Sequence, residues 1–161
     1  MNSPLSTGLD VNDDPSLTSL HKPHVLFVCE GNTCRSVFAE YIARKKFARV
    51  LEAASAGIRP GTPEECENAI YTLRETICVD ASGHIPRDVR FVQIECADLV
   101  VAMTSRIANQ LRALFPALRP ERLVRWRIKD PYGENLAEYR HCAQVIFKEM
   151  QKLPIIAIAS R

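Results

Sequence analysis

The sequence lacks any apolar run long enough to cross a membrane. Its longest apolar stretches, such as Val25–Val28 and Ile155–Ala159, fall far short of the roughly 18–20 residues that a spanning helix needs. Glycine is scarce, with 6 residues in 161, which excludes a collagen-like chain. An excess of one charge is also lacking: 21 Lys and Arg face 19 Asp and Glu, and the net charge of +2 gives no indication of a nucleic-acid partner.

What is present is the composition of a single globular domain. Hydrophobic residues make up 47% of the chain and charged residues 25%, as in ordinary soluble proteins, and the length suffices for one core. We expect a folded domain over residues 23–154, between an N-terminal extension of residues 1–22 and a C-terminal tail of residues 155–161.

The two end segments carry different signals. Residues 1–22 are rich in Asp, Ser and Pro and have neither the basic nor the apolar part of a secretory signal, so we expect a flexible extension on a cytoplasmic protein. The tail is apolar at Ile155–Ala159, although a helix stop precedes it. It either adds an edge strand or packs over a groove, and the sequence favours neither.

The six cysteines indicate neither a metal site nor a disulfide framework. No pair has the C-x2-C spacing of zinc ligands, and nothing marks the chain for an oxidising compartment. No metal and no cofactor are therefore expected. Four cysteines are expected to be buried as small apolar side chains, namely Cys66, Cys78, Cys96 and Cys142. The other two, Cys29 and Cys34, differ in their neighbours.

Strand and helix patterns alternate along the chain. Continuous β-branched apolar runs, typical of strands buried on both faces, are followed by stretches with apolar residues at helical spacing. The expected strands are His24–Cys29, Leu51–Ile58, Asp98–Met103 and Leu123–Ile128, and the expected helices run up to about Phe47 and over Pro63–Ile77, Thr104–Phe115 and Leu136–Leu153. This order predicts a single-domain α/β fold, a four-stranded parallel sheet flanked by helices on both faces. Ligands of such sheets bind at the carboxyl ends of the strands.

The sequence CEGNTCRS, which begins at Cys29, connects the first strand to the first helix. A loop this tight needs unusual backbone dihedrals, which Gly31 and Asn32 tolerate, and its N–H groups then point inward at the positive end of the helix. Arg35 adds a planar fork of donors suited to two phosphate oxygens. This environment favours a thiolate at Cys29, to which the hydroxyl of Ser36 can donate. The sequence thus predicts a phosphate-sized pocket with a nucleophilic sulfur at its floor.

Residues Val25–Glu40, VLFVCEGNTCRSVFAE, closely resemble the signature of the low-molecular-weight protein tyrosine phosphatases, VLFVCxGNxCRSPxAE. The similarity extends over nearly all of residues 24–153, since Ser55–Gly57, Asp98–Met103 and Asp130–Gly133 resemble the second-strand, third-strand and late DP-loop motifs of that family. The resemblance implies the same four-stranded parallel sheet and a phosphorylated protein or peptide as substrate. The oligomeric state is left open, with a monomer expected.

The resemblance also implies a mechanism. Cys29 attacks phosphorus in line and forms a thiophosphoryl intermediate, while Arg35 and the loop amides hold the phosphate oxygens. Asp130 protonates the leaving group and then activates water, and Pro131 restrains its backbone. The phosphate-binding residues are then Glu30, Gly31, Asn32, Thr33, Cys34 and Arg35, and the supporting residues are Ser36, Ser55 and His84.

Three positions depart from the common tyrosine phosphatase form. Val37 replaces a proline at the helix start, which removes rigidity but no chemistry. Glu30 places a carboxylate where an apolar residue is common, so we expect it to point to the rim. Thr33 stands where a bulky apolar side chain usually walls the phenyl ring, and it resembles the bacterial protein arginine phosphatases of the same family, whose leaving group is a cationic guanidinium. Tyr132 can wall the cleft for either substrate.

Other functions stay open beside phosphotyrosine hydrolysis. Phosphoarginine is one alternative substrate. The fold also resembles thioredoxin-coupled arsenate reductases, but Met103–Arg106 lacks the cysteines that those enzymes carry after the third strand. A non-catalytic phosphate-binding module is the last alternative, and the presence of Cys29, Arg35 and Asp130 together argues against it. In the family a cysteine placed like Cys34 can form a reversible disulfide with the nucleophile, so redox sensitivity is expected.

Overall fold

Four parallel strands form one sheet. The structure, a computed structural model, describes residues 21–159, with the side chains of 158 and 159 excepted; the expected N-terminal extension therefore lies, up to residue 20, outside the described residues. The sheet order is β2-β1-β3-β4, and the strands are β1 His24–Cys29, β2 Glu52–Gly57, β3 Leu99–Ala102 and β4 Leu123–Arg125. The predicted four-stranded parallel α/β fold is confirmed.

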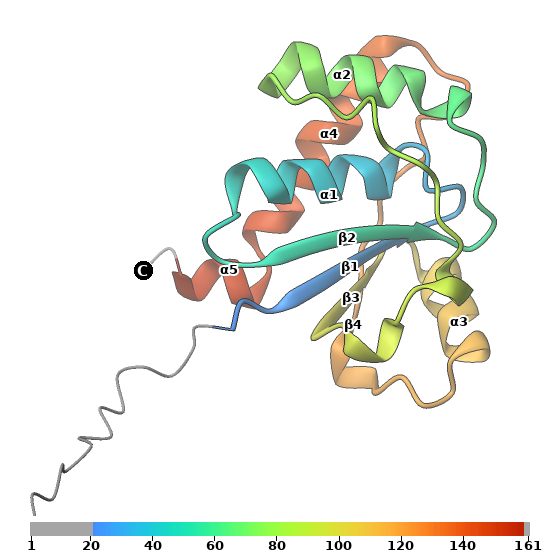
Figure 1. The fold of residues 1–161 in the computed structure, drawn as a ribbon, viewed down its shortest axis with the longest axis vertical. Coiled ribbons are helices and arrows are strands. Elements are labelled where there is room, and N and C mark those ends of the chain that lie inside the picture. Colours follow the sequence, from blue (N-terminus) through green and yellow to red (C-terminus); the bar gives the residue numbers. More distant parts are fainter. Residues whose placement is uncertain (1–20, 160–161) are drawn as a thin grey trace, which may run out of the picture.

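Helices cover both faces of the sheet (Figure 1). On one face, α1 Arg35–Lys46 packs on β1 and β2, with α2 Glu67–Ile77 and α4 Leu136–Gln151 beside it, while α3 Ser105–Leu114 contacts β3 and β4 from the other face. The remaining elements are short: η2 Glu64–Cys66, η3 Val89–Phe91, η4 Ile94–Cys96, η5 Pro120–Arg122 and α5 Pro154–Ala159. None of the described helices is long and apolar enough to cross a membrane.

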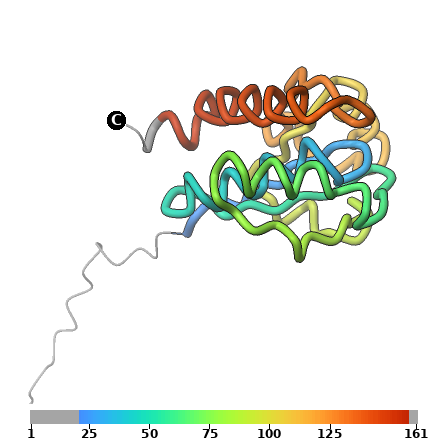
Figure 2. The backbone as a smooth tube through the Cα atoms, turned by 90° about the horizontal axis from the view of Figure 1, so that it is seen from above, coloured from blue at the N-terminus to red at the C-terminus, as the bar shows by residue number. Residues whose placement is uncertain are grey.

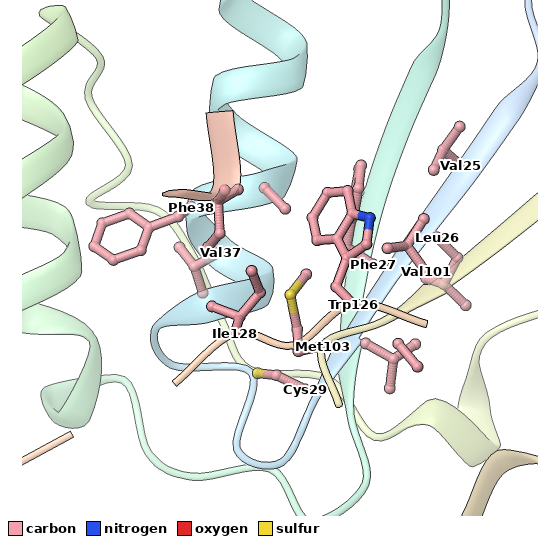
Figure 3. Packing of buried hydrophobic residues seen from close by; sticks show 14 of the residues in the cluster. Val25, Leu26, Phe27, Cys29, Val37, Phe38, Val101, Met103, Trp126 and Ile128 are labelled. Atoms are coloured by element: carbon pink, nitrogen blue, oxygen red, sulfur yellow. The ribbon is translucent and has the colours of Figure 1, made fainter. Parts of the chain in front are cut away.

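Burial on both faces explains why β1 is continuously apolar. Every residue of β1 after His24 is buried, because helices lie on one side and the loops and α3 on the other. Figure 3 shows the side chains of Val25, Leu26 and Phe27 along this strand. The rings of Phe27 and Trp126 lie 5.8 Å apart. A strand held so firmly gives Cys29, its last residue, a fixed position.

The strand order places a topological switch point beside Cys29. The chain passes from β1 outward to β2 and then crosses back to β3 on the other side of β1. Loops leaving the carboxyl ends of β1 and β3 therefore diverge, and the crevice between them is where ligands of such sheets bind. Both ends of the described chain lie at the opposite end of the molecule (Figure 2).

One strand is shorter than expected, and the structure decides against one of the two alternatives left open for the tail. The fourth strand is shorter than the expected Leu123–Ile128, because the ladder ends at Arg125; the chain nevertheless stays attached, with Trp126 N–H donating to the Ala102 carbonyl oxygen over 2.8 Å. The tail is not an edge strand, since Pro154–Ala159 forms α5. Ile156 is 2% exposed, and its burial near α4 explains the apolar character of this segment.

The expectation that four cysteines are buried is right for two of them and wrong for the other two. Cys66 and Cys142 are buried, but Cys78 and Cys96 are exposed, and all six cysteines are free thiols. Cys78 ends α2 with a φ of 53° in the left-handed region, where the chain leaves the helix toward solvent. Its position is therefore decided by the helix end rather than by its apolar side chain.

Candidate active site

The predicted phosphate loop runs from Cys29, the end of β1, to Arg35, the first residue of α1. Asn32 makes the turn with a positive φ of 53°, a left-handed conformation that asparagine tolerates better than most residues. Because α1 begins directly at the end of the loop, its first N–H groups have no acceptor within the helix and can bind an anion. Residues 32–36 are all buried, so the loop is packed into the domain.

Two groups donate hydrogen bonds to the sulfur of Cys29. The backbone N–H of Asn32 lies 3.2 Å from Sγ, and the hydroxyl oxygen of Ser36 lies 2.9 Å from it. The side-chain amide of Asn32 donates to that same hydroxyl oxygen over 2.9 Å, which leaves the Ser36 proton for the sulfur. A thiolate is the form of cysteine that accepts such hydrogen bonds best. Figure 3 shows the Cys29 sulfur where β1 enters the loop.

Further contacts hold the Asn32 turn from behind. The Asn32 side-chain amide also donates to the Ser55 hydroxyl over 2.8 Å, and Ser55 donates in turn to the Glu40 carboxylate. Asn32 Oδ1 accepts from the backbone N–H of Arg87 over 2.9 Å, and the Asn32 carbonyl oxygen lies 3.0 Å from His84 Nε2. Every polar group of Asn32 thus has a partner, so the turn is preorganised.

His84 supports the loop as a neutral ring. Burial lowers the pKa of His84, so it carries one ring proton at pH 7. The Asn32 carbonyl oxygen can only accept, which puts that proton on Nε2. The other nitrogen, Nδ1, lies 4.0 Å from the Glu40 carboxylate.

The guanidinium of Arg35 connects the loop to Asp130. Arg35 is 4% exposed; its Nη2 donates to Asp130 Oδ2 over 2.8 Å and its Nη1 to the Ile128 carbonyl oxygen over 3.2 Å. Its Nε is buried and has no hydrogen-bond partner among the described residues. An unpaired buried donor is costly, and a bound oxyanion is the acceptor that would satisfy it.

Asp130 reaches this site from the chain that follows β4. Its side chain is 44% exposed, and Oδ1 accepts from the Tyr132 backbone N–H over 3.2 Å. Pro131 between them is buried and restricts the Asp130 backbone to extended conformations. The carboxylate therefore stands at the mouth of the loop, beside Arg35 and in contact with solvent.

Cys29 and Arg35 lie at the two ends of one loop, and Asp130 comes from a distant segment at the same edge of the sheet. The family signature implies this arrangement. The sequence profile of the family described as "Low molecular weight phosphotyrosine protein phosphatase" matches residues 24–159. The chain belongs to this family.

Relatives of this phosphatase-family chain differ in their named activities. The low molecular weight protein tyrosine phosphatase from T. tengcongensis is 32% identical and superposes with a TM-score of 0.73 over 82% of this chain and 100% of its own. The YwlE arginine phosphatase from Geobacillus stearothermophilus is 26% identical, with a TM-score of 0.75 over 86% and 94%. Arsenate reductase 1 of Staphylococcus haemolyticus is 29% identical over 133 residues, 83% of this chain and 96% of its own.

Glu30 lies on the rim and is paired there. Its carboxylate accepts from Arg59 Nε over 2.8 Å and from Arg106 Nη2 over 2.9 Å. Both arginine side chains are largely exposed, whereas the Glu30 side chain is 24% exposed. These two ion pairs compensate the negative charge that the sequence places next to Cys29.

Thr33 and Tyr132 lie on another part of the rim. Thr33 is 7% exposed, and its methyl group packs closely on Gly61, where an added Cβ would come within 2.8 Å of it. Tyr132 is 57% exposed, and its hydroxyl donates to Glu65 Oε1 over 3.0 Å. The hydrogen bond to Glu65 raises the pKa of Tyr132.

Three buried cysteines near the loop are protonated. Burial raises the pKa of Cys34 to about 11, and that of Cys66 and Cys142 to about 12. Cys34 Sγ lies 3.6 Å from the Tyr139 hydroxyl. Within the described range no cluster of His, Cys, Asp or Glu could hold a metal ion.

Sequence reasoning missed three residues of this site. Glu40 had a local signal, because it lies one helical turn after Ser36 on the buried face of α1. Arg87 and Glu65 had no local signal. Arg87 contacts Asn32, which is 55 positions away, and Glu65 contacts Tyr132, which is 67 positions away.

Proposed function

We propose that this chain is a cysteine-dependent protein phosphatase that hydrolyses phosphotyrosine. Membership of the phosphatase family supports the reaction class. The observation that carries the proposal is the sulfur of Cys29, which accepts hydrogen bonds from Asn32 and Ser36 at the floor of a loop that opens a helix. A sulfur in this environment is a nucleophile directed at whatever anion the loop holds.

In the first step the Cys29 sulfur attacks phosphorus opposite the tyrosine oxygen. The S–P bond forms as the P–O bond breaks, and Asp130 gives its proton to the leaving oxygen. The loop N–H groups and Arg35, whose Nε has no partner among the described residues, hold the three other phosphate oxygens. Because the dianion competes for the Arg35 donors, its binding releases Asp130 for proton transfer.

In the second step water attacks the phosphocysteine. Asp130 takes a proton from the water, the S–P bond breaks, and phosphate leaves. The departing sulfur regains its negative charge next to the Ser36 hydroxyl, 2.9 Å away, which stabilises it. The nucleophile, the acid and the anion-binding donors all belong to this chain, so the steps draw on no cofactor.

A rapid-quench experiment tests this mechanism. After mixing with a 32P-labelled phosphotyrosine peptide, we expect label on the wild-type protein and none on Cys29→Ala, which has no nucleophile at this position. Asp130→Asn should lower kcat by about 10²–10⁴-fold. Cys96→Ser, at an exposed cysteine, is the matched control and should turn over like wild type. Normal turnover by Cys29→Ala would contradict the proposal.

Thr33 favours phosphoarginine as a second candidate substrate. Its side chain is short, and it lies against Gly61, so no bulky apolar wall faces a phenyl ring at this position. We expect Thr33→Ile to shift the ratio of kcat/KM values toward a phosphotyrosine peptide and away from a phosphoarginine peptide. An unchanged ratio would remove Thr33 as a reason for considering arginine.

Arsenate reduction and simple phosphate binding have weaker support. A reductase needs a thiol relay to the surface, but exposed Cys96 lines a groove with His24 at the amino end of β1, away from Cys29. Arsenate reduction with thioredoxin that depended on Cys78 or Cys96 would revive that activity. A binding module would hold phosphopeptides without turnover, which the quench experiment measures directly.

The free thiols also bear on where the reaction takes place. The nucleophile works only when reduced, and all six cysteines are free. We propose that the reaction takes place in the cytoplasm, where thiols stay reduced. The partner that we propose is a phosphorylated protein. A fusion to a redox-insensitive fluorescent protein, followed by imaging and fractionation, tests this location.

A further inference from the structure

Three carboxylates surround the mouth of the phosphate loop, and they differ in how their charge is compensated. Glu30 is paired with Arg59 and Arg106, and Asp130 is paired with Arg35. Glu65 forms no ion pair with any described residue; its partners are the backbone N–H of Thr62 and the hydroxyl of Tyr132.

Two hydrogen bonds fix Glu65 at this position, one from its own segment and one from Tyr132. Oε2 accepts from the Thr62 N–H over 2.7 Å, and Oε1 accepts from the Tyr132 hydroxyl over 3.0 Å. The side chain is half-buried and packs on Gly61, which in turn lies against Thr33 of the phosphate loop. The carboxylate therefore lies between the loop and Tyr132, where the organic part of a substrate must pass.

A carboxylate without a cation is unfavourable next to a phosphate site. It repels the incoming dianion, and partial burial reduces the screening by water that would weaken this repulsion. The phenyl ring of a phosphotyrosine substrate carries no positive charge that could offset this repulsion. A substrate that brings its own guanidinium replaces the repulsion by a charge-assisted hydrogen bond.

We propose that Glu65 is a specificity-determining residue that binds a guanidinium of the substrate at the mouth of the site. The guanidinium displaces the Tyr132 hydroxyl from Oε1 and leaves the Thr62 contact in place. It comes either from phosphoarginine itself or from an arginine beside a phosphotyrosine. This assignment rests on the proposed phosphatase activity and adds to it the charge of the preferred substrate.

The test compares kcat/KM for three peptides: phosphotyrosine with neutral neighbours, phosphotyrosine with an adjacent arginine, and phosphoarginine with neutral neighbours. Glu65→Gln is compared with Glu64→Gln, which removes an exposed carboxylate one residue away. We expect Glu65→Gln to lower the ratio of a guanidinium-bearing peptide to the neutral peptide by about three- to tenfold, while Glu64→Gln keeps the wild-type ratio. The peptide whose ratio falls identifies the source of the guanidinium.

A second variant separates this role from a structural one. Tyr132→Phe removes the hydroxyl that competes for Oε1, so it should raise the same ratio, whereas general damage to the rim would not. Equal changes for all three peptides in Glu65→Gln, or equal effects of Glu65→Gln and Glu64→Gln, would overturn the role of Glu65. Lack of wild-type turnover on every peptide would instead overturn the proposed function.

Discussion

Replacing Gly57 by alanine tests how closely the phosphate loop must lie against the end of β2. Gly57 pairs with Cys29 in the sheet register. An added Cβ would lie 2.7 Å from the Glu30 carbonyl oxygen, 2.9 Å from Asn32 N and 3.0 Å from the Gly31 carbonyl carbon. These are backbone atoms of the loop, so no side-chain rotation relieves the contacts.

The size of the effect follows from the displacement. Ordinary contact with a Cβ begins at 3.4 Å, so the loop must move away by more than half an ångström, on the order of the 1 Å misplacement that costs about 10²-fold in rate. We expect kcat/KM for a phosphotyrosine peptide to fall by about 10²-fold, with a loss of roughly 1–3 kcal/mol in the free energy of unfolding from overpacking.

The control is Gly83→Ala, because a Cβ at Gly83 meets no atom within 4 Å. Steady-state kinetics and thermal unfolding of both variants give the comparison. Gly83→Ala should match wild type in both measurements. If folded Gly57→Ala kept activity within threefold of wild type, the close fit between the loop and β2 would not be needed for catalysis.

Three further predictions concern the groups around the sulfur. Ser36→Ala removes the hydroxyl 2.9 Å from Cys29 Sγ and should lower kcat about tenfold or more, measured as slower breakdown of the phosphoenzyme; an unchanged rate would contradict the assigned hydrogen bond. Burial lowers the pKa of His84 from its usual 6.5, so the unfolded chain binds this proton more readily and stability falls as the pH drops below about 6.5. His84→Gln should therefore flatten the loss of Tm on acidification, and the same loss in both proteins would argue against it. Peroxide should convert Cys29 to a sulfenic acid, which the Cys34 thiol condenses to a disulfide with release of water. Disulfide formation should quicken as the pH rises toward the Cys34 pKa of about 11, because the thiolate is the attacking form. In Cys34→Ser the sulfenic acid has no such partner and peroxide oxidises it further to a sulfinic acid, so added thiol should restore wild type but not this variant; equal recovery of the two proteins would exclude the disulfide.

The strand, loop and helix that carry Cys29 and Arg35 were predictable because their signals are local. A β-branched apolar run, a turn containing Gly31 and Asn32, and a helical repeat follow one another directly in the chain. Each depends on backbone preferences of adjacent residues. The same holds for Asp130, which the DP-loop resemblance indicated and which the structure places on Arg35.

The open question of the tail and the wrong expectation for two cysteines both concern positions where burial rather than local preference decides. An apolar segment such as Ile155–Ala159 suits a strand or a buried helix, and only its contact with α4 decides for α5. Cys78 and Cys96 have the same side chain as Cys66, but they are exposed at the end of α2 and in η4. A short apolar segment or a single cysteine does not show by itself which part of the fold packs against it.

By itself the sequence determined the fold class, the family and the loop that begins at Cys29, because each is written in neighbouring residues and their periodicity. Only the tertiary structure decided which charges meet at the mouth of that loop. Glu65 and Tyr132 are 67 positions apart, and Arg35 and Asp130 are 95 apart. Their meeting depends on how parallel strands bring the ends of distant segments to one edge of the sheet.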